Sequence, residues 1–275
     1  MTNLSKAYCL EHKSEADRLE FQSSFPKYDF KSEFKNFDPK EGQRILDAGS
    51  GSGIVLRHFS KLYPESTFVG SDMSGERVSE ARERAQNLSN LSFQVEDLRE
   101  LSFSENTFDH VLSRYVVEHV PKAEIGQVFS EIFRVLKSTG EFHCVDFDGP
   151  IFNLFPCPPV VSRVLDALAF SPQLDLWIGR KIPYLMNEAG FTNIKWRIET
   201  IECQGEFLEH EFQLLPEKFD RIHNFICDLM GDMSIAKDFK REYLEALKKP
   251  GAVLYYNKFI VSGEKPSTLK ILDSK

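Results

Sequence analysis

A glycine-rich turn and two acidic residues form the pattern in this chain that is best suited to chemistry. Residues 44–53 read Arg-Ile-Leu-Asp-Ala-Gly-Ser-Gly-Ser-Gly, and Asp72 follows a second apolar run at 67–71. The glycines let the backbone turn tightly and approach a ligand, and a carboxylate at the end of the next strand can accept both hydroxyls of a ribose. We expect a βαβ unit that binds an adenosine derivative.

The spacing of the glycines and the acid before them indicate which derivative. A dinucleotide fingerprint has a third glycine where this chain has Ile54, and it brings a pyrophosphate against the following helix. Asp47 stands just before the turn, where its charge opposes a phosphate but suits an ammonium group. The pattern favours a nucleoside that carries an amino acid over a nicotinamide dinucleotide.

Four motifs in order over residues 40–150 resemble those of class I S-adenosylmethionine-dependent methyltransferases. They are residues 46–53 (Leu-Asp-Ala-Gly-Ser-Gly-Ser-Gly), Asp72, residues 95–98 (Val-Glu-Asp-Leu) and residues 113–120 (Ser-Arg-Tyr-Val-Val-Glu-His-Val). A glycine loop alone is a weak signal, whereas four ordered motifs are a strong one. The resemblance implies that S-adenosylmethionine is the methyl donor.

The resemblance also implies a role for each motif. The first motif surrounds the methionine part of the cofactor, the second binds the ribose, the third lies along the adenine, and the fourth faces the methionine end and the reacting methyl. An Arg-Leu-x-x-Gln pattern near the N-terminus resembles a helix that folds over the cofactor in one subset of these enzymes. The implied cofactor-binding residues are Asp47, Gly49, Ser50, Gly51, Gly53, Asp72, Met73, Asp97, Leu98, Ser113, Arg114, Arg18 and Gln22.

Several of these residues also fit purely structural roles. The glycines can serve only as turns, and Asp72 can cap a helix that begins at Ser74 or Gly75. Asp97 can cap or solvate a loop. The N-terminal helix can be a solvated amphipathic segment. These alternatives stay open at the level of the sequence.

Methyl transfer from a sulfonium needs alignment more than a catalytic triad, because the leaving group is already good. His119 is the leading candidate for a base, since it follows the fourth strand and titrates near neutral pH; Tyr115 is the second catalytic candidate, with Glu118 and His143 behind them. A histidine at this position can equally stabilise the loop. Arg114 can bind the cofactor carboxylate, bind an acidic acceptor, or pair with a nearby carboxylate such as Glu118.

Residues after the core motifs supply candidates for substrate binding. We assign Arg180 and Trp177 to the substrate, with Arg180 orienting an acidic group or lying on the surface. Asp146 and Asp148 could help to ligate Mg²⁺, but the accompanying Asp-Asn element is missing. We therefore expect no bound metal.

Hydrophobic periodicity predicts the elements that position these residues. Strands are expected at 44–48, 67–71, 91–95, 108–113 and 141–147, and helices at 53–63, 75–88 and 122–137. Such alternation is typical of a parallel sheet with helices on both faces. Ligands then gather at the carboxyl ends of the strands.

The pattern beyond residue 150 is less regular. Residues 152–159 contain three prolines and are predicted to form a loop beside the active site. A helix is expected over 180–190, and strands near 193–201 and 252–262 resemble the antiparallel edge pair of the family. The insertion at 205–251 has apolar residues at helical spacing, which predicts either a cap over the substrate pocket or ordinary core.

These elements predict an α/β, Rossmann-like, doubly wound and mostly parallel seven-stranded sheet with an antiparallel last strand and a helical cap. Residues 1–40 are expected to form an N-terminal helical cap segment and 41–150 the S-adenosylmethionine-binding core. Residues 151–275 would complete the same domain with the substrate-side loop, the cap insertion and the final strands.

Composition agrees with a cytoplasmic enzyme of small molecules. The 275 residues include 34 Lys and Arg against 42 Asp and Glu, a formal net charge of -8, and no dense basic run, which disfavours a nucleic-acid partner. No apolar run is long enough to span a membrane. The five cysteines lack C-x-x-C pairing, so neither a zinc site nor a disulfide framework is expected from them.

The leading hypothesis is an S-adenosylmethionine-dependent methyltransferase that acts on oxygen, nitrogen or carbon of a small or medium-sized, partly apolar acceptor. Two alternatives remain. One is a non-catalytic protein that binds the cofactor or its demethylated product as a regulator. The other, which Ile54 disfavours, is a nicotinamide-dependent oxidoreductase.

Overall fold

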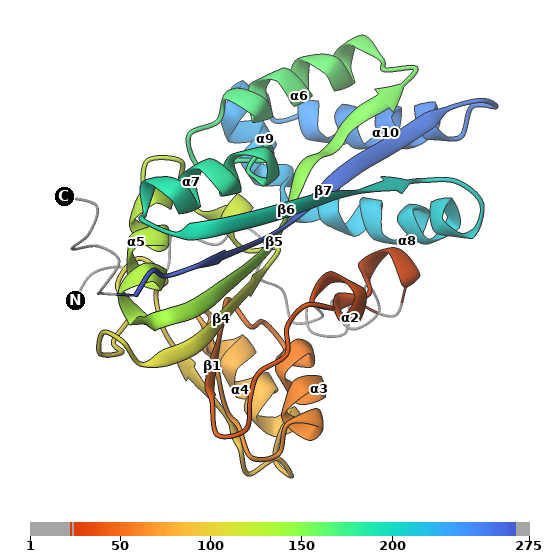
Figure 1. The fold of residues 1–275 in the computed structure, drawn as a ribbon. Helices are drawn as coiled ribbons and strands as arrows, with labels where there is room; N and C mark the ends of the chain where they lie inside the picture. Colours follow the sequence, from red (N-terminus) through yellow and green to blue (C-terminus); the bar gives the residue numbers. More distant parts are fainter. Residues whose placement is uncertain (1–22, 24, 268–275) are drawn as a thin grey trace.

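A single sheet of seven strands in the order β3-β2-β1-β4-β5-β7-β6 forms the centre of the computed structural model, which describes residues 23 and 25–267 (Figure 1). The first five strands pair in parallel, and β7 runs antiparallel to both β5 and β6. The predicted fold class is confirmed. The strands are β1 (Arg44–Ala48), β2 (Thr67–Asp72), β3 (Leu91–Val95), β4 (Phe108–Arg114), β5 (Leu136–Phe155), β6 (Thr192–Glu202) and β7 (Val253–Glu264).

Helices cover both faces because alternate side chains of each parallel strand point to opposite sides. Ile45 of β1 belongs to the core formed with α3 and α4, whereas the next residue, Leu46, belongs to the core formed with α5 and α7. The helices of the parallel part are α2 (Phe30–Glu33), α3 (Ile54–Leu62), α4 (Gly75–Arg84), α5 (Ile125–Val135) and α7 (Ile182–Glu188).

Strand β5 differs from the prediction. Residues 152–155 continue the strand, and 153–155 pair with β7, so the expected loop is wrong over 152–155; residues 156–158 form the short connection to the next helix. Three prolines suggested a loop, but Pro156 and the two that follow it lie after the strand, and Pro150 lies in the register shift between Asp148 and Asn153. Proline is excluded only where a ladder hydrogen bond is needed. Pro150 falls where the pairing is irregular, and the other three fall after the last paired residue. A helix, α6 (Pro159–Phe170), then begins at a proline.

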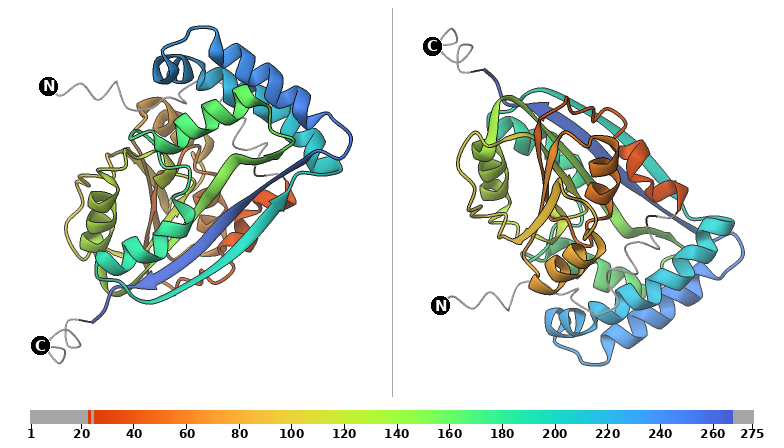
Figure 2. Two further views of the ribbon diagram at one scale, coloured as in Figure 1. Left: turned by 90° about the horizontal axis from the view of Figure 1, so that it is seen from above. Right: turned by 90° about the horizontal axis from the view of Figure 1, so that it is seen from below.

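The remaining helices gather at one end of the molecule, beside the extended part of β5 and β7 (Figures 1 and 2). They are α8 (Glu206–Arg221), α9 (His223–Met230) and α10 (Ile235–Leu247), and they pack with α6. A separate apolar core lies here, and it joins Phe219 and Phe239 of these helices to Leu154 of β5 and Tyr256 of β7. The apolar insertion is therefore a layer of helices with its own core.

The N-terminal helix and a membrane span are the last two predictions that concern the fold. Arg18 and Gln22 lie outside the described residues. Within the described part of the chain, no helix has both the length and the apolar character needed to cross a bilayer.

Candidate active site

A cavity of about 290 Å³ lies at the carboxyl ends of β1, β2 and β4. The chain leaves β1 toward β2 on one side and returns to β4 on the other, which is the place where open α/β sheets bind ligands. Of the residues selected from the sequence, the following line it: Asp47, Gly49, Ser50, Gly51, Asp72, Met73, Asp97, Leu98, Arg114, Tyr115 and His119.

Gly49 and Gly53 show why the turn after β1 is rich in glycine. Both have positive φ, +87° and +73°. A Cβ on Gly49 would lie 2.4 Å from Cγ2 of Val116, and a Cβ on Gly53 would lie 2.4 Å from Cζ of Phe93. Gly53 does not line the cavity, and the missing Cβ allows close packing of α3 on the sheet. This packing favours the structural alternative for Gly53, and its contact with the cofactor stays a prediction.

Asp72 connects the glycine turn to the second strand. Its Oδ2 accepts a hydrogen bond from the N–H of Gly51 at 3.0 Å, and its Oδ1 accepts one from the N–H of Ser74 at 3.0 Å. The N-cap of α4 is Ser74, whose hydroxyl accepts from the N–H of Arg77. Each carboxylate oxygen keeps further lone-pair capacity on the cavity side, so Asp72 can still accept from two hydroxyls.

Asp47 is a buried acid at the wall of the same cavity. Burial raises the pKa of its carboxyl to about 7, the nearby Arg114 partly offsets this effect, and the charge of Asp72 adds to it. A bound cation would favour the ionised form by replacing the lost hydration. This end of the cavity therefore suits an ammonium or sulfonium group and opposes a phosphate.

Asp97 lines the cavity and is paired with an arginine. The side chain of Arg99 binds it, with Nε 2.8 Å from Oδ1, and these hydrogen bonds hold the pKa of Asp97 below its usual value. Arg99 also lines the cavity and reaches Glu124. Sequence reasoning missed Arg99; its position two residues after the acid of the third motif was the available signal.

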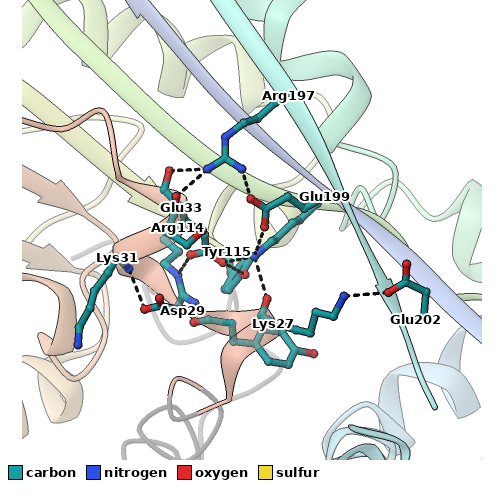
Figure 3. Close-up of polar contacts among 12 residues, drawn as sticks. Lys27, Asp29, Lys31, Glu33, Arg114, Tyr115, Arg197, Glu199 and Glu202 are labelled. Carbon is teal, nitrogen blue, oxygen red and sulfur yellow. Dashed lines mark hydrogen bonds and ion pairs between the residues drawn. The ribbon is translucent and has the colours of Figure 1, made fainter. Parts of the chain in front are cut away.

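Arg114 belongs to a buried cluster of charges behind the cavity (Figure 3). Its Nε donates to Glu33, and its terminal nitrogen donates to the carbonyl of Tyr28 at 2.7 Å. Glu33 also accepts from Nζ of Lys258 at 2.7 Å and from the hydroxyl of Tyr115 at 2.6 Å. Of the three roles that the sequence allowed for Arg114, pairing with a carboxylate occurs, but the partner is Glu33 and not Glu118.

Tyr115 does not fit a catalytic base. Its hydroxyl donates to Glu33, and burial, with the charge of Glu33, raises its pKa well above the usual value. Its ring stacks on Phe147, with the centroids 4.2 Å apart. Tyr115 has a φ of +58°, which directs the chain into the loop that carries the other candidate.

His119 remains the candidate base that faces the cavity. It ends a short 3-10 helix, η3 (Val117–His119), and its Nε2 lies 3.5 Å from a carboxylate oxygen of the buried Glu118. Asp146 holds this helix, since its Oδ2 accepts from the N–H groups of Val117 at 2.8 Å and of Glu118 at 3.3 Å. Asp146 therefore holds η3 in place.

Four other predicted residues lie outside the cavity lining. Ser113 is buried and does not line the cavity, and its place beside the reacting methyl stays a prediction. Arg180 and Trp177 also lie outside the lining. Nε and Nη2 of Arg180 donate to Asp148 at 2.8 and 2.7 Å, and its guanidinium stacks over Trp177 at 4.6 Å. Their side chains pack against β5 next to its register shift. His143 lies on β5, away from the cavity.

The part of the cavity away from the glycine turn is lined mostly by apolar side chains, several of them from the inserted helices. The insertion also contributes a polar residue to the cavity wall, Lys218, whose Nζ lies 3.5 Å from a carboxylate oxygen of Glu211. The hydrophobic lining comes from β5, α6, the segment after α6, α8 and α9, and consists of Phe147, Ile151, Leu168, Leu174, Leu176, Phe219, Ile222 and Phe225. The cavity thus joins a polar, acidic half to an apolar half.

Comparisons with known proteins agree with this geometry. The family described as "Methyltransferase domain" matches residues 45–140. The ubiquinone/menaquinone biosynthesis C-methyltransferase UbiE of Rickettsia felis is 34% identical over 180 residues, which cover 56% of this chain and 70% of that protein. UbiE of Desulfotalea psychrophila is 33% identical over 111 residues, 40% of this chain, and the match spans only 44% of the relative's length.

A solved structure extends the likeness to the fold. Phosphoethanolamine N-methyltransferase 2 of Haemonchus contortus, in complex with phosphomonomethylethanolamine and S-adenosylhomocysteine, superposes with a TM-score of 0.56. The two chains are 22% identical, and the superposition covers 86% of this chain and 52% of the other. At this identity the likeness concerns the fold alone.

Proposed function

Because this chain belongs to the class I S-adenosylmethionine-dependent methyltransferases, with S-adenosylmethionine as methyl donor, we propose that it methylates a small or medium-sized, partly apolar acceptor. Membership of this family disfavours both the regulatory binder and the nicotinamide-dependent oxidoreductase. The observation that supports the acceptor class is the joined cavity, whose apolar half is lined in part by the inserted helices.

The residues of the polar half fit the donor. The buried carboxylate of Asp47 would face its ammonium group, Asp72 would accept from the ribose hydroxyls, and Met73 and Leu98 would flank the adenine. When bound, S-adenosylmethionine supplies a methyl group on a sulfonium, which is a good leaving group. The protein then has to align the acceptor, exclude water and, where the acceptor is protonated, remove a proton.

His119 is the residue that we assign to proton removal. It faces the cavity, and Glu118 lies beside its ring. For an acceptor whose nucleophilic atom is protonated at neutral pH, His119→Gln should lower kcat by about 10²–10⁴-fold and leave the affinity for S-adenosylmethionine unchanged. An unchanged kcat with such an acceptor would assign His119 to the stability of the loop.

The acceptor class is tested with purified protein, S-adenosylmethionine carrying an isotopically labelled methyl group, and acceptors of graded apolar length. The relatives named for carbon methylation in quinone biosynthesis make a hydroxylated aromatic ring with an apolar substituent the first choice. Each added methylene that enters the cavity should raise kcat/KM about fourfold, from about 0.8 kcal/mol of burial.

Two phenylalanines provide matched variants for this test. Phe225→Ala removes a ring from the cavity and should flatten the dependence on apolar length. Phe170→Ala removes a ring that is 88% exposed and should leave the dependence intact. Preference for short hydrophilic acceptors, or equal effects of the two variants, would refute the proposed acceptor class.

A further inference from the structure

Two buried histidines and a glutamate meet on the sheet, away from the cavity. His110 lies on β4, and Glu141 and His143 lie on the neighbouring strand β5, with His110 directly opposite Glu141. One ligand atom from each residue can be chosen so that all three lie within 4.8 Å of one another. The histidine side chains are only 9% and 7% exposed. None of the three lines the cavity.

Hydrogen bonding determines which nitrogen of His110 carries the proton. Oε1 of Gln43 accepts from the N–H of Lys40 at 2.6 Å, so this atom is an acceptor. Nε2 of His110 lies 3.2 Å from the same oxygen and must donate to it. Nδ1 of His110 is therefore left with a lone pair, and it lies 3.8 Å from Oε2 of Glu141.

The polar atoms that face one another in this group are poorly satisfied. Nε2 of His143 lies 3.1 Å from Oε2 of Glu141. Among the described residues, neither this atom nor Nδ1 of His110 has a hydrogen-bond partner of good geometry. Such orphaned buried atoms are uncommon in native structures and call for a bound water or ion.

We propose that His110, Glu141 and His143 form a binding site for a transition-metal ion, with Zn²⁺ as the best match. Two imidazole nitrogens and one carboxylate oxygen are a ligand set that Zn²⁺ accepts, with a further position for water. Mg²⁺ and Ca²⁺ prefer sites made of oxygen ligands. The hydrogen bond from His110 to Gln43 is the outer contact that typically orients a metal-binding imidazole.

Closing the site needs only a small movement. Bonds of 2.0–2.1 Å in a tetrahedral site place ligand atoms about 3.3 Å apart. The carboxylate oxygen of Glu141 already lies 3.1 Å from Nε2 of His143 and 3.8 Å from Nδ1 of His110. The remaining change is an approach of the ligand atoms that lie up to 4.8 Å apart. The ring of Phe37 covers both imidazoles, with centroids 5.3 and 5.7 Å away. The bound ion would join β4 to β5 beneath the segment that contains Phe37, which is a structural role.

This site replaces the expectation of a protein without a metal. Glu141 and His143 are two residues apart on one strand, so their side chains share a face, and this spacing was visible in the sequence. The third ligand comes from β4, and only the pairing of the two strands brings it alongside. The proposal does not depend on the methyltransferase activity.

Equilibrium dialysis of chelator-treated protein against Zn²⁺ alone, with metal analysis of the protein, tests the site. We expect one ion per chain, and visible absorption of the Co²⁺-loaded protein should show tetrahedral coordination. The double variant His110→Ala/His143→Ala and the milder Glu141→Gln should each weaken binding by at least tenfold. His223→Ala, on α9, is the matched control and should bind as the wild type does.

The pH dependence of Zn²⁺ binding is a second test of the site. Because the imidazoles bind in their unprotonated form, Zn²⁺ affinity should fall as the pH is lowered. Circular dichroism identifies a variant that fails to fold, and Glu141→Gln then decides the outcome because its substitution conserves shape at a partly exposed position. Equal metal uptake by wild type and Glu141→Gln, or less than a tenth of an ion per wild-type chain, would overturn the proposal.

Discussion

The variant Glu33→Gln tests the buried charge cluster behind the cavity. Glu33 is 3% exposed and accepts hydrogen bonds from Arg114, Lys258 and Tyr115. The substitution removes the negative charge and leaves two cations in a site with little water. Removal of one partner from a buried ion pair typically costs about 3–5 kcal/mol. Lys258 also has Glu199 at 3.0 Å, so we expect a loss near the lower end, about 3 kcal/mol.

The thermal shift follows from the size of the protein. For a chain of this length, a loss of about 1 kcal/mol in the free energy of unfolding lowers the Tm by a little under about 2 °C. Glu33→Gln should therefore lower the Tm by about 5 °C. Glu202→Gln is the matched control, because the ion pair between Glu202 and Lys27 is 51% and 46% exposed. An exposed pair contributes at most about 1 kcal/mol, so the control should change the Tm by less than 2 °C.

Calorimetry at several pH values tests whether the charge of Glu33 stabilises the folded protein. Burial opposes ionisation of Glu33, but Arg114 and Lys258 outweigh it and hold its pKa below the usual value. An acid whose pKa is lower in the folded state stabilises the fold at pH values above its unfolded pKa, which is about 4.3 for glutamate. This stabilisation is lost as the pH falls through the folded pKa. The Tm difference between wild type and Glu33→Gln should therefore be full at pH 7 and shrink below pH 4. Equal shifts for Glu33→Gln and Glu202→Gln at pH 7 would refute the reasoning.

Three further predictions concern the donor half of the cavity. Asp72→Ala should weaken S-adenosylmethionine binding by about 1.5–3 kcal/mol in titration calorimetry, and unchanged affinity would exclude its ribose role. Burial raises the pKa of Asp47 to about 7, so raising the pH from 6 to 8 ionises this carboxyl and should strengthen binding of the cationic donor. Asp47→Asn should remove this pH dependence of the affinity. The same pH dependence in wild type and Asp47→Asn would contradict the role of Asp47. Gly49→Ala brings a methyl group into contact with Val116 and should abolish S-adenosylmethionine binding. Gly42 has a similar φ of +77° but open space around it, so Gly42→Ala should preserve binding. Similar losses of affinity in both variants would assign the effect to backbone strain.

The parallel part of the fold was predictable because its signals are local. Apolar runs that alternate with amphipathic segments specify strands and helices one element at a time, and the glycine turn after β1 fixes where the chain can bind a ligand. The error at β5 has a local cause too. Pro156 was counted against the strand, although it follows the last paired residue, Phe155.

The contacts of the charged residues were less predictable, because they depend on partners far apart in the chain. Arg114 and Glu33 are separated by 81 residues, and Arg180 and Asp148 by 32. A lone arginine in a sequence fits a substrate, a surface or a buried acid equally well. Only the packing of α2 against the sheet selects Glu33 for Arg114, and only the turn before α7 selects Asp148 for Arg180.

The cluster of Glu33 also has an electrostatic consequence for the donor. Arg114 lies close enough to Asp47 to lower its pKa, and an unpaired guanidinium there would repel a sulfonium. Its ion pair with Glu33 cancels that charge and leaves Asp47 as the acid at this end of the cavity. Glu33→Gln should therefore weaken S-adenosylmethionine binding at a temperature where the variant is fully folded, and added salt should not restore it, since buried charges are poorly screened. A folded Glu33→Gln protein with wild-type affinity would show that the charge of Arg114 does not reach the donor.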